Sequence, residues 1–186
     1  MTMLPPFDHP DIIAGQGTLG LEILEDLPEV ETVVVPLSGG GLIAGVARAI
    51  KSANPQIRVV GVTMERGCAM YQSQKAGKPV QVEEVPTLAD ALGGGIGLDN
   101  RYTFAMERDL IDDLVLVSEE QIAAAICHAY FEEKQVIEGS GAVGIAALRA
   151  GLVDAPGVAA LVVSGCNIDM ALHARLIRGA PVELAR

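Results

Sequence analysis

The sequence contains no tryptophan, and its three tyrosines and three phenylalanines make up only 3% of 186 residues. A hydrophobic core must therefore be built from Ala, Val, Leu and Ile, which is typical of a parallel α/β sheet buried on both faces. With 50% hydrophobic residues, the chain is long and apolar enough to form such a core. No apolar run reaches the length of a bilayer span, so no transmembrane segment and no membrane partner are expected.

Basic residues are also scarce. Thirteen Lys and Arg stand against 24 Asp and Glu, which gives a formal charge of −11. Binding to nucleic acid or to an anionic membrane requires a basic surface, so neither is an expected partner. Cys68, Cys127 and Cys166 are an odd number without a CxxC pair, and no signal peptide precedes them. These features are typical of reduced thiols in the cytoplasm, which is the expected location.

Strand-like and helix-like segments alternate along the chain. Strands are predicted at residues 32–36, 58–62, 114–117 and 159–163. Helices are predicted at residues 16–27, 42–53, 68–76, 118–133, 141–150 and 169–178, the fourth of them opened by a capping box at Ser118. The pattern predicts a single α/β domain over residues 1–186, with an open, mostly parallel twisted sheet and helices on both faces.

The two ends of the chain bear on its domain organisation. Residues 1–10 are expected to be mostly loop, and the first regular element after them is a helix, predicted at 16–27. A doubly wound sheet seldom opens this way, because the βα units that normally flank its strands are missing. We therefore expect the chain to be the C-terminal part of a longer protein, without a regulatory domain.

Residues 31–50, ETVVVPLSGGGLIAGVARAI, join a buried strand to an amphipathic helix through Ser38 and three glycines. Glycines let backbone N–H groups approach a ligand closely, and a helix start presents unpaired donors and a partial positive charge. The turn therefore predicts a site for a phosphate-sized anion. A Walker-type loop is excluded, because no Lys-Ser or Lys-Thr follows the glycines.

Two other interpretations of this turn remain open. Gly39, Gly41 and Ala44 match G-x-G-x-x-A, and Glu65 follows at about the distance of a ribose-binding acid, as in an NAD(P)-dependent oxidoreductase. Three consecutive glycines suit one phosphate better than a pyrophosphate. The remaining possibility is a non-catalytic ligand-binding or oligomerisation module.

Four segments in register carry a resemblance to a known family. They are AGQGTLGLEI (14–23), PLSGGGLIAG (36–45), VIEGSGAVGIAAL (136–148) and LVVSGCNID (161–169). Together they resemble the threonine/serine dehydratases, which belong to the tryptophan-synthase-β-like, fold-type II enzymes that use pyridoxal phosphate. The resemblance covers nearly the whole chain. Residues 93–106, GGGIGLDNRYTFAM, are similar to the dehydratases of hydroxyectoine utilisation within this family.

The resemblance implies a cytoplasmic, homo-oligomeric lyase of amino-acid metabolism, expected as a homodimer. With pyridoxal phosphate as cofactor, it would remove water from a hydroxylated amino acid or a similar small molecule. Ser164 would meet the pyridine nitrogen, Glu138 would lie near the ring, and Asn167 would support the Ser164 turn. The cofactor phosphate would be held by the main-chain amides of Ser38, Gly39, Gly40, Gly41 and Leu42.

Two departures from the family pattern matter. Where some members place Glu and Asp around a structural cation, this chain has Thr63 and Ala69, so no metal site is predicted. The lysine that forms the Schiff base belongs to the N-terminal half of the family. The lysines of this chain lie in surface-like contexts, at positions 51, 75, 78 and 134. A catalytic lysine is therefore expected upstream, and the isolated chain is expected to be inactive.

Overall fold

The structure, a computed structural model, describes residues 5–184. The first four residues of the predicted loop 1–10 thus lie outside the described residues. The strands are β1 (Val30–Pro36), β2 (Arg58–Met64), β3 (Asp113–Val117) and β4 (Val158–Leu161). The helices are α1 (Pro10–Asp26), α2 (Gly41–Ala53), α3 (Ala69–Ala76), α4 (Thr103–Leu110), α5 (Glu119–Phe131), α6 (Gly139–Arg149) and α7 (Met170–Ile177), with a short 3₁₀ helix, η1 (Asp90–Leu92).

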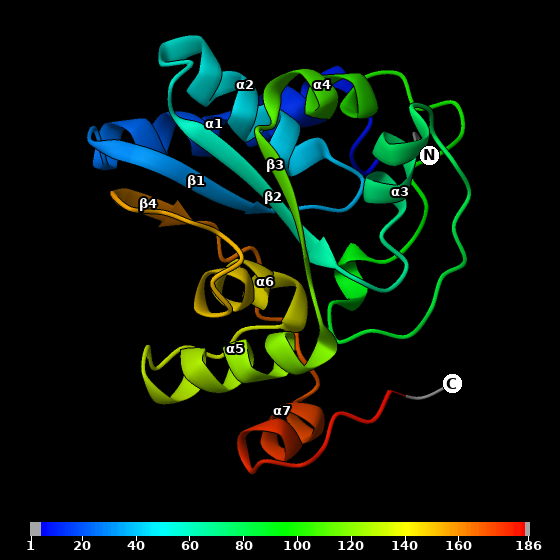
Figure 1. The fold of residues 1–186 in the computed structure, drawn as a ribbon, viewed down its shortest axis with the longest axis vertical. Coiled ribbons are helices and arrows are strands. Elements are labelled where there is room, and N and C mark those ends of the chain that lie inside the picture. The colour runs from blue at the N-terminus through cyan, green and yellow to red at the C-terminus, as the bar shows by residue number, and fades with distance from the viewer. Residues whose placement is uncertain (1–4, 185–186) are drawn as a thin grey trace.

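The four described strands form one sheet, and all three strand pairs are parallel. The strand order is β3-β2-β1-β4, so the chain first runs outward from β1 to β3 and then returns to place β4 on the other side of β1 (Figure 1). The predicted fold class is confirmed. In open parallel sheets, ligands bind at the carboxyl ends of the strands where the order reverses, which is here between β1 and β4.

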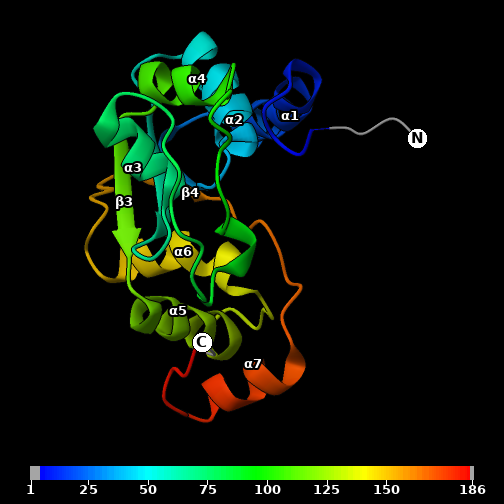
Figure 2. The same ribbon diagram turned by 90° about the vertical axis from the view of Figure 1, so that its right-hand side faces the viewer.

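Helices cover both faces of the sheet (Figures 1 and 2). Successive strand residues point to opposite faces, so Val33 and Val35 pack with α2 while Val34 packs with α6. Helix α6 lies between the sheet and α5, and α7 lies beyond α5. The aliphatic composition thus fills two cores, as expected for a sheet buried on both sides. The β4 edge is less covered, and the Val163 side chain that follows it is 48% exposed.

Two helix predictions were wrong. Helix α1 begins at Pro10 and not at residue 16, because His9 caps it by accepting a hydrogen bond from the Asp11 N–H and proline occupies the first turn. Helix α4 was not predicted at all. The capping box at Ser118 is confirmed, since its hydroxyl accepts from the Gln121 N–H while the Gln121 side chain accepts from the Ser118 N–H.

Helices α1 and α2 approach each other closely at Gly45. A Cβ added there would overlap the Ile13 carbonyl oxygen and lie 2.6 Å from the Gly17 nitrogen. Both of these atoms belong to the backbone of α1, so neither can move without shifting the helix. This contact matters for the site, because α2 begins at the glycine turn.

Gly45→Ala is expected to lower the free energy of unfolding by about 2–3 kcal/mol, because the extra methyl forces the two helices apart. The matched control is Gly15→Ala on the exposed side of α1, where an added Cβ meets no atom within 4 Å. That control should be neutral, or stabilising by about 0.5–1 kcal/mol, because alanine restricts the unfolded chain. Urea denaturation of the two variants measures both values, and equal destabilisation would contradict the close contact.

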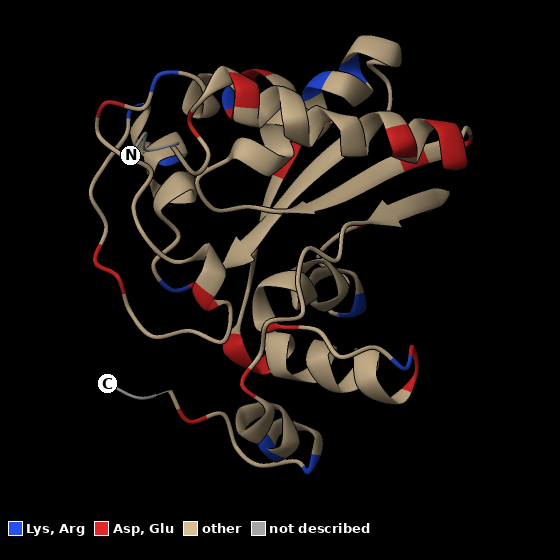
Figure 3. Ribbon diagram, turned by 180° about the vertical axis from the view of Figure 1, so that it is seen from behind, with Lys and Arg blue, Asp and Glu red and all other residues tan. Residues whose placement is uncertain are grey.

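None of the helices in the described part of the chain is both long and apolar enough to cross a membrane. Figure 3 shows that Lys and Arg residues are scattered among acidic ones and do not gather on one face. The phosphate site predicted from the sequence therefore has to rely on backbone donors, which the glycine turn supplies.

Candidate functional site

The glycine turn and the turn after β4 meet at the switch point of the sheet. Residues 38–41 follow β1, Ser164 follows β4, and both line one cavity of about 370 Å³. Phe7 and Leu92 contribute apolar walls to the same cavity. Two segments that are separated by more than a hundred residues in the sequence thus face one space at the carboxyl ends of neighbouring parallel strands.

The backbone of the glycine turn offers free hydrogen-bond donors. Gly40 caps α2 in the left-handed conformation, with φ 93° and ψ −7°, and no side chain caps the helix. Among the described residues, none accepts a hydrogen bond from the N–H groups of residues 38–42. The partial positive charge of the α2 start adds to these donors, so the turn fits an anion.

The side chains of Phe7 and Glu107 cover the Cα side of the same turn. Neither residue was predicted from the sequence to lie at the site. A Cβ at Gly39 would overlap the Phe7 ring, and one at Gly41 would lie 2.9 Å from the Phe7 Cα. A Cβ at Gly40 would overlap the carboxyl of Glu107. Packing therefore requires glycine at these three positions, in addition to any approach of a ligand to the N–H side.

Glu138 supports the turn after β4. Its carboxylate accepts a hydrogen bond from the Asn167 N–H (2.8 Å), and its own N–H donates to the Gly165 carbonyl (3.2 Å). A Cβ at Gly165 would lie only 2.6 Å from the Glu138 carboxylate, so the two segments pack in direct contact. Ser164 lines the cavity while Glu138 stands behind the turn. Asn167 contributes its backbone to this support.

The segment before α1 is fastened beside the site by Asp8. Its carboxylate accepts hydrogen bonds from the N–H groups of Arg101 (2.7 Å), Tyr102 (2.9 Å) and Thr103 (3.0 Å), at the start of α4. Desolvation raises the pKa of Asp8, but these hydrogen bonds outweigh it and hold the pKa below its ordinary value. The carboxylate thus keeps Phe7 over the glycine turn. This contact could not be predicted from the sequence, because the partners lie up to 95 residues apart.

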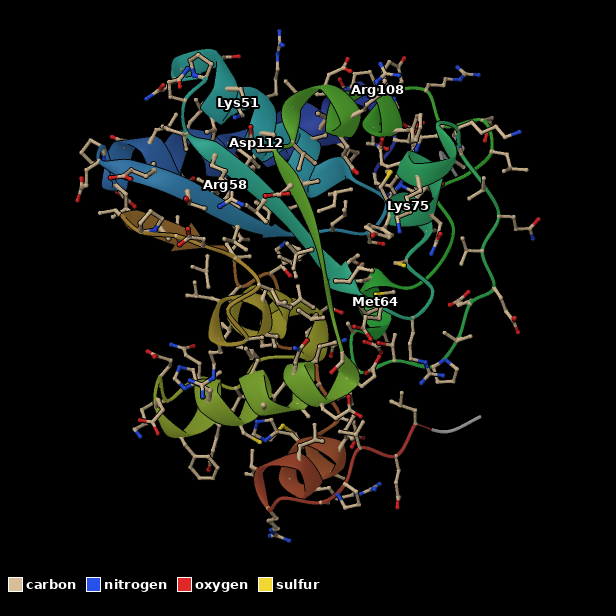
Figure 4. The ribbon with its side chains drawn as sticks, in the orientation of Figure 1. Lys51, Arg58, Met64, Lys75, Arg108 and Asp112 are labelled. Carbon is tan, nitrogen blue, oxygen red and sulfur yellow. The ribbon has the colours of Figure 1, made fainter. Side chains whose placement is uncertain are left out.

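The lysines of the chain lie away from this cavity. Lys51, at the opposite end of α2 from the glycine turn, pairs with Asp112 at 2.6 Å (Figure 4). Lys75 stacks over an aromatic ring within α3, at 4.5 Å from its centroid. Lys134 donates to a carbonyl of α5, and Lys78 is exposed in a turn. A side-chain amine does not line the cavity from any of the four positions.

Thr63 and Ala69, which replace the cation-binding Glu and Asp of some family members, are buried. Thr63 donates its hydroxyl hydrogen to the Met64 sulfur (3.3 Å), and the side chain of Ala69 carries no oxygen. Between residues 5 and 184, no three His, Cys, Asp or Glu side chains are grouped as metal ligands. The absence of a cation stays a prediction.

The family to which this arrangement belongs is shown by comparison with known proteins. The model of the pyridoxal-phosphate dependent enzymes matches residues 1–165, and the chain belongs to that family. The predicted resemblance is therefore confirmed. Membership of this family favours pyridoxal phosphate over the nicotinamide interpretation of Gly39, Gly41, Ala44 and Glu65.

The names of individual relatives are more specific than the description of the family. A Sinorhizobium fredii protein named "Putative threonine dehydratase" is 59% identical over 180 residues, which are 96% of this chain and 54% of that protein. The L-threonine ammonia-lyase of Thermotoga maritima is 46% identical and is matched over 97% of this chain and 45% of its own length. The processed threonine deaminase isoform 2 of Solanum lycopersicum superposes with a TM-score of 0.85 at 36% identity, covering 96% of this chain and 52% of that one. The chain spans about half the length of these relatives.

The residues at the cavity fit the cofactor of the family. Free N–H groups and a helix start suit its phosphate, and a neutral hydroxyl is available from Ser164, which lines the same cavity. Which of these residues touch the cofactor stays a prediction.

Proposed function

We propose that this chain forms the phosphate- and ring-binding part of a pyridoxal-phosphate dependent dehydratase. The complete protein would remove water from a hydroxylated amino acid such as threonine or serine. One observation carries the proposal: in a member of this family, the donors of residues 38–42 and Ser164 line the same cavity at the switch point between β1 and β4.

The described residues would act by binding and orientation. The N–H groups of residues 38–42 would hold the phosphate, aided by the α2 dipole, while Phe7 and Leu92 keep water from one side of the cavity. When bound, pyridoxal phosphate supplies an electron sink that allows a Cα proton and a β-hydroxyl to leave. Ser164 would present a hydroxyl, which cannot keep the ring nitrogen protonated as a carboxylate would. Glu138 would hold Ser164 in place through Asn167.

The proposal includes a further segment of the same enzyme, which would bring the catalytic lysine. The length of the relatives supports it, and so does the less covered β4 edge of the sheet. Next to β4, a cavity of about 440 Å³ is lined by apolar side chains of α1 and β4, among them Leu19 and Ile23. An unpaired apolar edge strand is normally covered in a folded protein.

The proposal also covers the oligomeric state, the cellular location and the substrate. A homodimer is supported by an apolar cavity of about 480 Å³ between α1, α2 and α4, beside which Leu21 is 59% exposed. A cytoplasmic location is supported by free cysteines at 68, 127 and 166. A hydroxylated cyclic compatible solute as substrate rests on residues 93–106 and stays a prediction.

Titration calorimetry tests the proposed cofactor. Pyridoxal phosphate should bind the protein at one site, whereas NAD should give no binding heat. Pyridoxal without the phosphate is the matched control ligand, and it should bind at least about 100-fold more weakly, because the charge-assisted hydrogen bonds of the turn are lost. Heat with NAD but none with pyridoxal phosphate would reverse the assignment in favour of an oxidoreductase.

A further inference from the structure

The carboxyl group of Glu107 is buried directly behind the glycine turn. The residue is 2% exposed, and neither carboxyl oxygen has a hydrogen-bond partner among the described residues. Its Oε1 occupies the place where a side chain at Gly40 would start, and the Thr103 Cβ lies 2.9 Å from that same point. The carboxyl thus fills the space beneath the one left-handed residue of the turn.

No positive charge compensates this carboxyl. Helices α2 and α3 pack against α4, and Asp8 binds the N-terminal end of α4. Within the described chain, no ion pair includes Glu107. The charged groups on these neighbouring elements have other partners or face solvent; they are Arg48, Lys51, Lys75, Asp8, Arg108 and Asp109.

A buried carboxyl without a partner is far more stable when neutral than when ionised. Desolvation accordingly raises the pKa of Glu107 well above its ordinary value. Burial therefore favours the protonated form of Glu107 up to a higher pH than for an exposed glutamate. Glu107 itself is not among the residues that line the cavities beside α1, α4 and the glycine turn.

We propose that the neutral carboxyl of Glu107 is a positioning residue for the glycine turn, and that its ionisation weakens the hold of this turn on a dianionic phosphate group. This inference rests on the proposed function of the turn. Glu107 acts through Gly40 and not by touching the cofactor.

The physical basis is thermodynamic linkage between the proton on the Glu107 carboxyl and the anion bound by the glycine turn. An ionised Glu107 would place a negative charge in a poorly solvated space beside the N–H groups that bind the phosphate, and the two charges would repel each other. By reciprocity, a bound phosphate favours the protonated carboxyl. The folded state also binds this proton more tightly than the unfolded state. Its contribution to stability is therefore present below the unfolded pKa and is lost as the pH rises through the folded pKa.

The experiment uses the full protein freed of cofactor, with sulfate as the probe. Sulfate stays a dianion from about pH 6.5 to about pH 9, so any change in its affinity over this range reports on the protein. The wild type should bind sulfate about tenfold more weakly at the upper end than at the lower end. Glu107→Gln keeps the shape and removes the ionisation, so its affinity should change by less than about twofold.

Glu119→Gln is the matched control, because Glu119 is a second buried glutamate, located at the start of α5 and away from the turn. It should follow the wild-type pH profile. In infrared spectra at neutral pH, the wild type should also show a protonated carboxyl band that Glu107→Gln lacks.

The outcomes separate this inference from the proposed function. A pH profile of Glu107→Gln that matches the wild type would overturn the role of Glu107. A wild-type spectrum without the protonated band would do so even if the variant does not fold, and so would a sulfate affinity that depends on added K⁺ or Mg²⁺, because a cation would then hold an ionised Glu107. If the wild type binds neither sulfate nor pyridoxal phosphate at any pH, the proposed function fails first.

Discussion

Replacement of Gly40 by aspartate will abolish the retention of pyridoxal phosphate by the protein. Gly40 has a φ of 93°, a conformation that costs a non-glycine residue about 1–2 kcal/mol. Its new Cβ would also overlap the buried Glu107 carboxyl. The added carboxylate would then either enter the space of the phosphate or lie beside the neutral carboxyl of Glu107. Each arrangement opposes an anion at the N–H groups of the turn.

The measurement is the cofactor absorbance that remains with the protein after gel filtration, together with the dissociation constant. The affinity should fall by at least about 100-fold. Gly77→Asp is the matched control, because Gly77 is also left-handed, with φ 69°, and an added Cβ there meets no atom within 4 Å. This control should lose about 1 kcal/mol of stability and keep its cofactor. Retention of cofactor by Gly40→Asp would show that another part of the protein holds the phosphate.

The two segments that form the candidate site could be found from the sequence because they follow buried strands. Strands are predicted at 32–36 and 159–163, and the glycines and Ser164 come directly after them; the structure then pairs these strands as neighbours, β1 and β4. The carboxyl ends of parallel strands meet at one edge, so a correct fold class brings both turns to one place. The resemblance of four segments to a known family then favoured a site for a single phosphate over a site for a dinucleotide. The spacing of Gly39, Gly41 and Ala44 alone could not decide between the two.

The covering of the site could not be predicted, because it depends on contacts between distant residues. Helix α4 has eight residues, and its N-terminal N–H groups are capped by Asp8 from far away in the sequence. No local signal marks such a cap. Its position in turn places Glu107 behind Gly40, while Asp8 places Phe7 in front. The start of α1 at Pro10 was also not predicted, because Gly15 and Gly17 lower the helix propensity of this segment. Gly17 is needed there for a contact with a distant part of the chain, since α2 packs closely against it.

The isolated chain is expected to bind pyridoxal phosphate but to release no 2-oxo acid from threonine or serine above the rate of free cofactor. Elimination requires an amine that holds the cofactor covalently and moves the Cα proton. The lysines of this chain are unsuited to that role, since Lys51 is paired with Asp112 and the other three lie on the surface away from the cavity. Adding the N-terminal half of the enzyme, in the same chain or as a separate fragment, should raise the rate by several orders of magnitude.

The assay is release of 2-oxo acid, followed with the chain alone and with the added half. Lys51→Arg and Lys75→Arg provide the controls: arginine keeps the positive charge but cannot form a Schiff base, so both variants should leave the rate of the complete enzyme within about twofold of wild type. Turnover by the chain alone that Lys51→Arg abolishes would mean that the pair with Asp112 opens and that α2 carries the catalytic amine. The amine would then belong to Lys51, ten residues beyond Gly41 on the same helix and about 15 Å from the glycine turn along the helix axis. A phosphate held at the turn cannot bring the cofactor aldehyde that far, so this result would also move the cofactor away from residues 38–42.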